Sequence, residues 1–598
     1  MPISAKTRAG IAALAIAAAA LPAIGQDRPE SLLPPGFGDN QPTPTPRATG
    51  NGPASLLPPS VAASPGQPGA IVQPLPTDTP SPTPSATPTP TPMDAKALAD
   101  YELPPFARRS LALVGPGGVD GGLPADAFGR ADGRYLEGLM RSLDAPLPSR
   151  WMSILLRRTL ASQLRTPRNV NGADFAAERA WLLLRMGESV AARAVAQSVD
   201  TGNASRKLLE VAMNTSLATG DPGGLCPLAD RGRQATGERG WVMAQAMCAG
   251  LSGNATAAKS LMAQARRRRV AEGVDLRLAQ KVSGAGPGGG QAVTIEWSPA
   301  DTLTVWRFGL ASATGVAIPA EMFATTGSQV RYWQALSPSV GDADRLPYAE
   351  AAAGQGVLSN AALVDLFGAI DEGDDVPAAA SAAASDLRVA YVGGDTDARI
   401  GAIRQLWGEA AATPYARLVL TARAAARLPV GEGLEDADRL VASMLSAGLD
   451  RSAARWRGRV TQGGDAWAMI ALADPDRGGR LTYNAVAGYG GTGDAALKQR
   501  LFFAGLAGLG RLTPEDAQRA AEALEVPVGA SNAWTQALDR AVMAREPGTV
   551  VLLCAVGLQT PAWRGVPPAT LYRITAALTA VGLDGYARMI AAEAIARA

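Results

Sequence analysis

The 598-residue chain contains no histidine, but it has three cysteines and 54 Asp and Glu residues. Without imidazole, the Ser-His-Asp and Cys-His forms of nucleophilic catalysis are excluded, and so are metal sites that need a histidine ligand. The side chains that remain can supply carboxylate, hydroxyl, amine and thiol chemistry. Their positions along the chain decide which of these groups can act together.

Two of the three cysteines are spaced for a disulfide. Cys226 and Cys248 are separated by 22 positions and fall near the two ends of an expected helical hairpin. Such ends can approach within the roughly 4.4 to 6.8 Å between Cα atoms that a disulfide requires, and an oxidising compartment favours the bond. Cys554 lies in the apolar run 550–556, as a small buried hydrophobic residue does. The sequence therefore predicts a Cys226–Cys248 disulfide and an unreactive Cys554.

Two segments resemble ligand-binding loops without completing them. Residues 488–493, GYGGTG, fit the G-x-G-x-x-G spacing that holds a pyrophosphate at a helix N-terminus. A dinucleotide fold also needs a series of strands alternating with helices, which this chain lacks, so a flexible connection between helices is favoured. Residues 474–479 begin like a calcium loop, but Gly478 and Ala485 occupy positions that need acids. No cofactor and no metal ion are expected.

The remaining charged motifs also favour structural roles. The basic run Arg266–Arg269 suits the solvated C-terminal end of a helix, and binding of a polyanion is the alternative. The acidic cluster 371–375 is interpreted as a solvated turn between helices. Thr256 and Lys259 approach a Ser-x-x-Lys nucleophile, but the residue is threonine and the accompanying motifs are missing. No catalytic residue is predicted.

The N-terminus has the layout of a secretory signal peptide. Lys6 and Arg8 precede the apolar stretch 9–21, and small residues lie before a cleavage point near Gly25. An uncleaved membrane anchor is the alternative, although the apolar stretch is short for a span of about 20 residues. Lysine makes up six of the 56 cationic residues and arginine the other 50, a bias typical of a GC-rich bacterial genome. The predicted compartment is the periplasm of a Gram-negative bacterium.

Residues 26–93 read as a disordered Pro/Thr-rich tether, because they hold 19 of the 45 prolines. Proline removes backbone donors and fixes φ, so polyproline II or coil is expected. A short apolar motif occurs twice in this tether and can dock into a partner's groove, with sequence drift as the alternative. Its two copies are Ser31, Leu32, Leu33, Pro34 and Pro35, and Ser55, Leu56, Leu57, Pro58 and Pro59. A glycosylated stalk is a further interpretation of the Thr-Pro tract.

From residue 94 onwards the signals are helical. Residues 174–199 predict two helices broken at Gly187, and Thr513 followed by Pro514 predicts a helix start directly after Gly510. Ser298 is expected to begin another helix. Strand candidates are few and short, namely 293–297 and 481–486.

Similar turns recur between these helices, at Gly187, Gly250, Gly448 and Gly582. Glycine closes one helix there, and an acid or serine caps the next, so the unit is an antiparallel helix pair. Across 177–269 the chain resembles tetratricopeptide-like repeats of the bacterial envelope. The residues that carry the resemblance are Ala180, Trp181, Leu184, Gly187 and Ala191. No steady period of about 34 residues continues along the chain, so the resemblance implies a helical scaffold and no binding residues.

The sequence therefore predicts an all-α fold, an irregular α-solenoid of antiparallel helix pairs behind a disordered arm. The expected regions are a signal peptide (1–25), a tether (26–93) and two helical-repeat regions, 94–290 and 291–598, with a break at the Gly-rich segment 284–290. The predicted function is a non-catalytic periplasmic scaffold or adaptor that binds a protein or envelope partner, with no nucleic acid. The alternative is a carbohydrate- or peptidoglycan-acting enzyme with a superhelical body.

Overall fold

The computed structural model describes residues 104, 107–287, 292–298, 300–374, 376–409, 413–431, 433–476 and 479–598. The predicted signal peptide, the tether and both Leu-Leu-Pro-Pro copies lie outside the described residues. The described chain is mostly helical, as the all-α prediction requires. Its strands are β1 (Leu113–Val114) and β2 (Leu164–Arg165), which pair antiparallel with Leu113 opposite Arg165.

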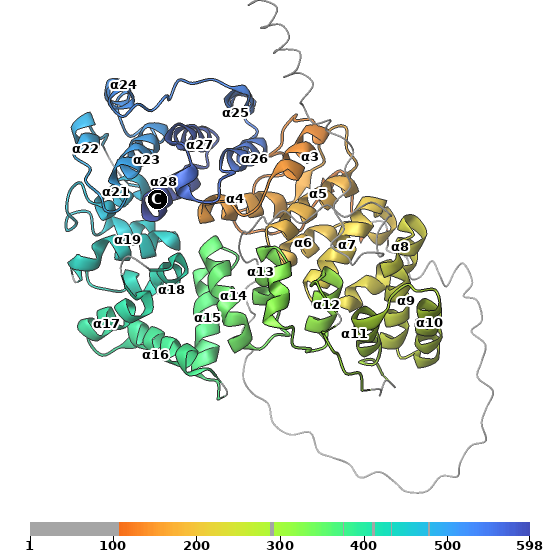
Figure 1. Ribbon diagram of the computed structural model, residues 1–598. Helices are drawn as coiled ribbons and strands as arrows, with labels where there is room; N and C mark the ends of the chain where they lie inside the picture. The colour runs from red at the N-terminus through yellow and green to blue at the C-terminus, as the bar shows by residue number, and fades with distance from the viewer. Residues whose placement is uncertain are drawn as a thin grey trace, which may run out of the picture.

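The first half of the described chain forms short helices joined by tight turns, and it occupies the orange to green part of Figure 1. Its α-helices are α3 (Gly133–Ser142), α4 (Arg150–Ala161), α5 (Gly172–Arg185), α6 (Ser189–Ala196), α7 (Arg206–Ala218), α8 (Ala229–Thr236), α9 (Arg239–Leu251), α10 (Ala255–Arg267), α11 (Gly273–Ser283), α12 (Val305–Ala313), α13 (Ser328–Leu336), α14 (Asp342–Gln355) and α15 (Asn360–Asp371). Its 3-10 helices are η2 (Thr201–Asn203), η3 (Pro222–Leu228) and η4 (Ala320–Thr325).

The second half continues in the same manner to the C-terminus. Its α-helices are α16 (Ala378–Val392), α17 (Thr396–Trp407), α18 (Tyr415–Ala426), α19 (Ala437–Ser446), α20 (Asp450–Ala454), α21 (Asp465–Ala473), α22 (Tyr483–Ala487), α23 (Ala495–Gly508), α24 (Pro514–Ala523), α25 (Ala533–Met543), α26 (Pro547–Gly557), α27 (Pro568–Ala580) and α28 (Asp584–Arg597). Its 3-10 helices are η6 (Leu434–Asp436) and η7 (Trp563–Gly565). None of the described helices has the length and apolar character that crossing a bilayer requires.

Three of the predicted glycine turns and one predicted helix cap lie where the sequence places them. Gly187, Gly448 and Gly582 have φ values of +87°, +77° and +81°, the left-handed conformation that glycine adopts at little cost. Thr513 caps α24, since its hydroxyl oxygen accepts a hydrogen bond from the backbone N–H of Asp516 at 3.1 Å. The helices on either side of each of these three turns pack against one another. The predicted acid caps are wrong, because Glu188 makes no side-chain cap and the N-cap residues of α20 and α28 are Leu449 and Leu583.

Three local predictions are wrong. Residues 293–297 form no strand, and of residues 481–486 only Leu481 makes a single bridge, while α22 begins at Tyr483. The helix expected after Ser298 begins only at Val305, where Thr304 supplies the cap.

The fourth predicted turn also lies elsewhere. Gly250 belongs to α9, and Gly253, with φ +83°, makes the turn instead. Gly250 is required for a different reason, because a Cβ there would overlap the side chain and backbone of Ser283 on α11.

Helix α4 lies at the centre of the described structure. It packs against α5 and α6, against α14 from the middle of the chain, and against α26 and α28 from its C-terminal end. Figure 1 shows α4 between the orange helices and the blue C-terminal helices. Ten of its twelve residues are buried. The two ends of the described chain are therefore in contact through α4.

Contacts also cross the expected break near residue 290. Helix α12 packs against α11 and α7, and α13 packs against α6. One hydrophobic core extends from Val114 to Ile595 across both predicted helical-repeat regions. The division into the regions 94–290 and 291–598 stays a prediction. The assembly of the helix pairs into a solenoid also stays a prediction.

Candidate functional site

A hollow of about 500 Å³ lies between β1 and the C-terminal end of α6. We call it the β1–α6 hollow. Its lining combines small, apolar and amide side chains with one arginine. The lining residues are Arg109, Ser110, Leu113, Gly115, Pro116, Gly117, Gln163, Ala194, Gln197 and Ser198.

Hydrogen bonds join two wall segments of this hollow that lie about 80 residues apart in the sequence. The backbone N–H of Arg109 donates to Asp200 Oδ2 at 2.8 Å, and its guanidinium donates to the carbonyl oxygen of Gln197 at 2.5 Å. Gly115 has φ +132° and lies against the Ser162 carbonyl, so only glycine fits there. Leu113 remains 39% exposed. The hollow thus offers an apolar contact beside hydrogen-bonding amides, with no carboxylate among its lining residues.

A second hollow of about 470 Å³ lies between α16 and the segment that joins α17 to α18. It is more charged, because Asp386, Glu409 and Arg417 belong to its lining. Arg417 already pairs with Glu350 at 2.7 Å and lies over the ring of Phe367. Arg417 therefore already interacts with residues of α14 and α15.

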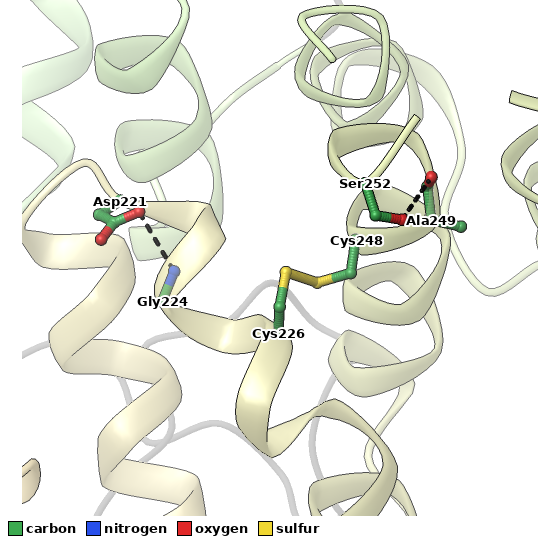
Figure 2. Close-up of a disulfide and its surroundings, with 6 residues drawn as sticks. All are labelled: Asp221, Gly224, Cys226, Cys248, Ala249 and Ser252. Carbon is green, nitrogen blue, oxygen red and sulfur yellow. Dashed lines mark hydrogen bonds between the residues drawn. A yellow bond between two sulfur atoms is a disulfide. The ribbon is translucent and has the colours of Figure 1, made fainter. Parts of the chain in front are cut away.

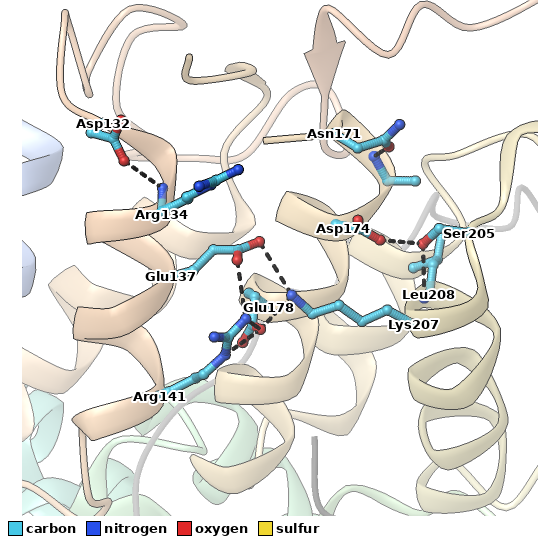
Figure 3. Close-up of polar contacts among 11 residues, drawn as sticks. Asp132, Arg134, Glu137, Arg141, Asn171, Asp174, Glu178, Ser205, Lys207 and Leu208 are labelled. Atoms are coloured by element: carbon cyan, nitrogen blue, oxygen red, sulfur yellow. Dashed lines mark hydrogen bonds and ion pairs between the residues drawn. The ribbon is translucent and has the colours of Figure 1, made fainter. Parts of the chain in front are cut away.

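Two carboxylates do lie close together, where α3, α5 and α7 meet (Figure 3). Glu137 pairs with Arg141 at 3.0 Å and with Lys207 at 3.2 Å. Glu178, which is 1% exposed at its side chain, accepts from Arg141 Nε at 2.7 Å and also pairs with Lys207. Each acid faces both cations, so the cluster is electrically balanced. None of its members lines either hollow. This arrangement suits the joining of three helices better than acid–base catalysis.

The glycine-rich segment 488–493 wraps around a buried carboxylate. Asp465, at the start of α21, accepts from Lys498 Nζ at 2.8 Å and from Thr492 Oγ1 at 2.7 Å, and the Tyr489 hydroxyl also donates to it. Burial, together with the charge of Asp465, raises the pKa of Tyr489. A Cβ on Gly491 would overlap Asp465 and Tyr489. Gly491 therefore makes room for this carboxylate and the Tyr489 hydroxyl.

The carboxylates of the calcium-like segment also interact with other groups of the protein. Asp474 is 1% exposed and pairs with Arg457, and its Oδ1 accepts the backbone N–H of Asp476 at 2.9 Å. Asp476 lies 3.5 Å from Arg451. Among the residues that the structure describes, no group of three or more Asp, Glu or Cys side chains is placed to hold a metal ion.

Cys226 and Cys248 are joined by a disulfide in the structure, with their Cα atoms 5.5 Å apart (Figure 2). Cys226 belongs to η3, whose start is held by Asp221 accepting from the Gly224 N–H at 3.1 Å. Cys248 lies near the end of α9. The bond thus links η3 to α9 across α8, and a loop of this length would contribute about 3 kcal/mol to stability in the chain-entropy model.

The other singled-out residues lie apart from both hollows. Cys554 is buried in α26, and burial raises the pKa of its thiol. Arg266–Arg269 are exposed at the end of α10. Asp371 ends α15 and lies 3.3 Å from Arg388. Thr256 and Lys259 are exposed on α10 and make no catalytic arrangement with one another.

The sequence did not point to the β1–α6 hollow. Its walls come from 109–117, 163 and 194–198, and no motif links these segments. The one available signal was the cluster Gly115, Pro116 and Gly117, which marks a turn without saying what it faces. No protein-family model, no curated protein and no solved structure matches this chain. Its function is therefore argued from its own residues.

Proposed function

We propose that this chain is a non-catalytic helical-repeat scaffold of the bacterial periplasm, which binds an extended segment of a protein or envelope partner in the β1–α6 hollow. The signal-peptide pattern of residues 1–25 supports export to the periplasm. The recurring helix pairs support a repeat scaffold. The tether would carry the Leu-Leu-Pro-Pro copies to a second contact.

The observation that carries the proposal is the chemistry of the β1–α6 hollow. The exposed side chain of Leu113 supplies an apolar contact, and Gln163 and Gln197 supply amide donors and acceptors. An extended peptide needs both kinds of partner, because its backbone groups must be satisfied while its side chains are buried. A hydrolytic site would need free acids, and the close pair Glu137 and Glu178 is already neutralised by cations.

The test is a pull-down from envelope extracts with three forms of the purified protein. Leu113→Asp places a charge in the hollow, whereas Val392→Asp places the same charge at a residue that is 70% exposed on α16. A specific partner should be recovered by the natural protein and by Val392→Asp, and lost from Leu113→Asp. Direct titration with that partner should give the same order.

Two results would contradict the proposal. One is that all three forms recover the same proteins, or none, since the hollow would then not be the binding surface. The other is release of muropeptides from purified sacculi by the protein, since the chain would then be an envelope enzyme.

A further inference from the structure

Four helix ends meet at one end of the α8–α11 region. Helices α9 and α10 form a hairpin that turns at Gly253, so the end of α10 lies beside the start of α9. Helix α8 ends just before α9 begins, and α11 begins just after α10 ends. Figure 1 shows α9 and α10 side by side at the right-hand edge of the molecule, with α8, which packs against α9, above them. Residues near these four ends are therefore neighbours in space.

Exposed arginines gather at this place, which we call the arginine end. Arg266–Arg269 are the run at the end of α10, and Arg233 and Arg239 join them from the end of α8 and the start of α9. All six are exposed. Within the described contacts only Arg269 has an acidic neighbour, Glu272, at 3.9 Å. The basic run of the sequence is thus part of a larger surface that only the fold assembles.

The helices around the arginine end also carry an excess of positive charge. Residues 229–287 contain ten Lys and Arg against four Asp and Glu, a balance of +6, whereas the complete chain carries +2. Two of the four acids are buried: Asp275 is held by Arg307 through two hydrogen bonds of 3.0 Å, and Glu238 is 9% exposed. The rest of the chain therefore carries −4, and an anionic surface would attract this end and repel the remainder.

We propose that the arginine end docks the protein on the surface of an anionic phospholipid membrane, as a peripheral contact distinct from the β1–α6 hollow. A guanidinium presents a planar fork of donors that matches a phosphate group, and juxtamembrane basic clusters are attracted to anionic lipid. All six arginines are exposed and none of them lines either hollow, so they present a surface to an extended partner.

The composition of the arginine end argues against the other polyanionic partners. Single-stranded nucleic acid is held by aromatic side chains that stack on bases, and the one aromatic residue in 229–287, Trp241, is fully buried. Protein interfaces rely on apolar anchors, and the large exposed apolar side chains of the described structure all lie elsewhere. Those side chains are Leu113, Tyr135, Val392, Leu434 and Met543. A densely charged, flat partner fits best.

The experiment measures sedimentation of the full chain with phosphatidylcholine vesicles that contain or lack phosphatidylglycerol. The test variant is R239Q/R266Q/R267Q, and the matched control is R459Q/R480Q/R500Q, which removes the same charge from exposed arginines elsewhere. Each arginine removed from the surface should weaken binding about fivefold, so the test variant should lose about 100-fold. The control should lose less than about fivefold, and thermal melts should show that all forms are equally folded.

Further measurements decide between the sources of negative charge. Binding to the phosphatidylglycerol vesicles should fall with added salt and should not be displaced by inorganic phosphate at matched ionic strength. Single R239Q should weaken binding as much as single R266Q, because the fold places the two arginines together. The proposal is overturned by equal losses in the two triple variants, by equal binding to neutral vesicles, by specific displacement with phosphate, or by tighter binding to a single-stranded oligonucleotide. None of these results depends on the partner of the β1–α6 hollow.

Discussion

At the scale of single residues, Glu593 connects the two ends of the described chain. It lies on α28, and its carboxylate accepts from Ser149 Oγ at 2.6 Å and from the backbone N–H groups of Arg150 and Trp151 at 2.7 and 3.2 Å. It therefore caps the N-terminus of α4 from more than 440 residues away. The Glu593 carboxylate also pairs with Arg597 of its own helix, at 2.8 Å.

Glu593→Gln should destabilise the protein by about 3 kcal/mol, because it removes a buried negative charge that faces donors on α4 and on Arg597. The new amide also presents N–H donors to groups that are themselves donors. The measurement is urea unfolding. Glu522→Gln, at an exposed position on α24, should change stability by less than about 0.5 kcal/mol. Equal effects of the two substitutions would mean that Glu593 does not hold the ends together.

Cys554 should be unreactive in the native protein at pH 8. Burial raises the pKa of its thiol, so the reactive thiolate is depleted there, and the residue is fully buried. Titration with a thiol reagent should find no thiol in the native chain, one after unfolding without reductant, and three after unfolding with reductant. Three thiols without reductant would show that Cys226 and Cys248 are not bonded.

At the scale of elements, the glycine-rich segment before α23 shows how a loop motif can serve the core. Its spacing fits nucleotide binding, but the loop encloses Asp465, which Lys498 and Tyr489 contact. The geometry depends on Gly491, where a side chain has no room. Gly490, its direct neighbour, has open space around its Cβ position. Both glycines belong to the same sequence motif, but only Gly491 is required for steric reasons.

Gly491→Ala should cost about 1 to 3 kcal/mol, since the added methyl group displaces the Asp465 and Tyr489 side chains. Gly490→Ala should leave stability within about 0.5 kcal/mol of the natural protein. Thermal unfolding followed by circular dichroism measures both. The steric role of Gly491 would be refuted if both variants melted together with the natural protein.

At the scale of the whole molecule, α4 makes the N-terminal and C-terminal helices interdependent. It packs against α5 and α6, which follow it directly in the sequence, and against α26 and α28 near the C-terminus. Two of its arginines are buried as well. Burial lowers the pKa of Arg150 to about 10, so its charge is kept at neutral pH and is satisfied by carbonyl oxygens, including that of Ser446 at 3.1 Å. Arg157 lies 3.4 Å from Glu188.

The fragments 94–290 and 291–598 should therefore fail to fold cooperatively when each is produced alone. The first fragment would expose the face of α4 that packs against α14, α26 and α28, and the second would expose the matching faces of those helices. Arg150 would also lose its partners Ser446 and Glu593. Circular dichroism melts of each fragment, and of the two mixed, measure this. A sharp transition in either fragment alone, near the melting temperature of the complete chain, would show that the two regions are independent domains.

Local chemistry made much of the secondary structure predictable. The turns at Gly187, Gly448 and Gly582 and the cap at Thr513 depend on residues close in sequence, so their φ preferences and hydrogen bonds could be anticipated. The helix start predicted at Ser298 was wrong because an equally good cap, Thr304, follows six residues later. Capping residues indicate where a helix can begin, and packing selects among them.

The sequence by itself determined the helical class, the helix pairs, and the exclusion of histidine-dependent chemistry, because these depend on composition and short-range periodicity. Only the tertiary structure decided which distant residues meet. It placed Glu593 of α28 at the start of α4, packed α10 against α9, and brought Leu113 and Gln197 into one hollow. The physical reason is that burial of apolar faces is non-directional, so many pairings of similar helices satisfy a sequence pattern, and side-chain packing and buried charges select one of them.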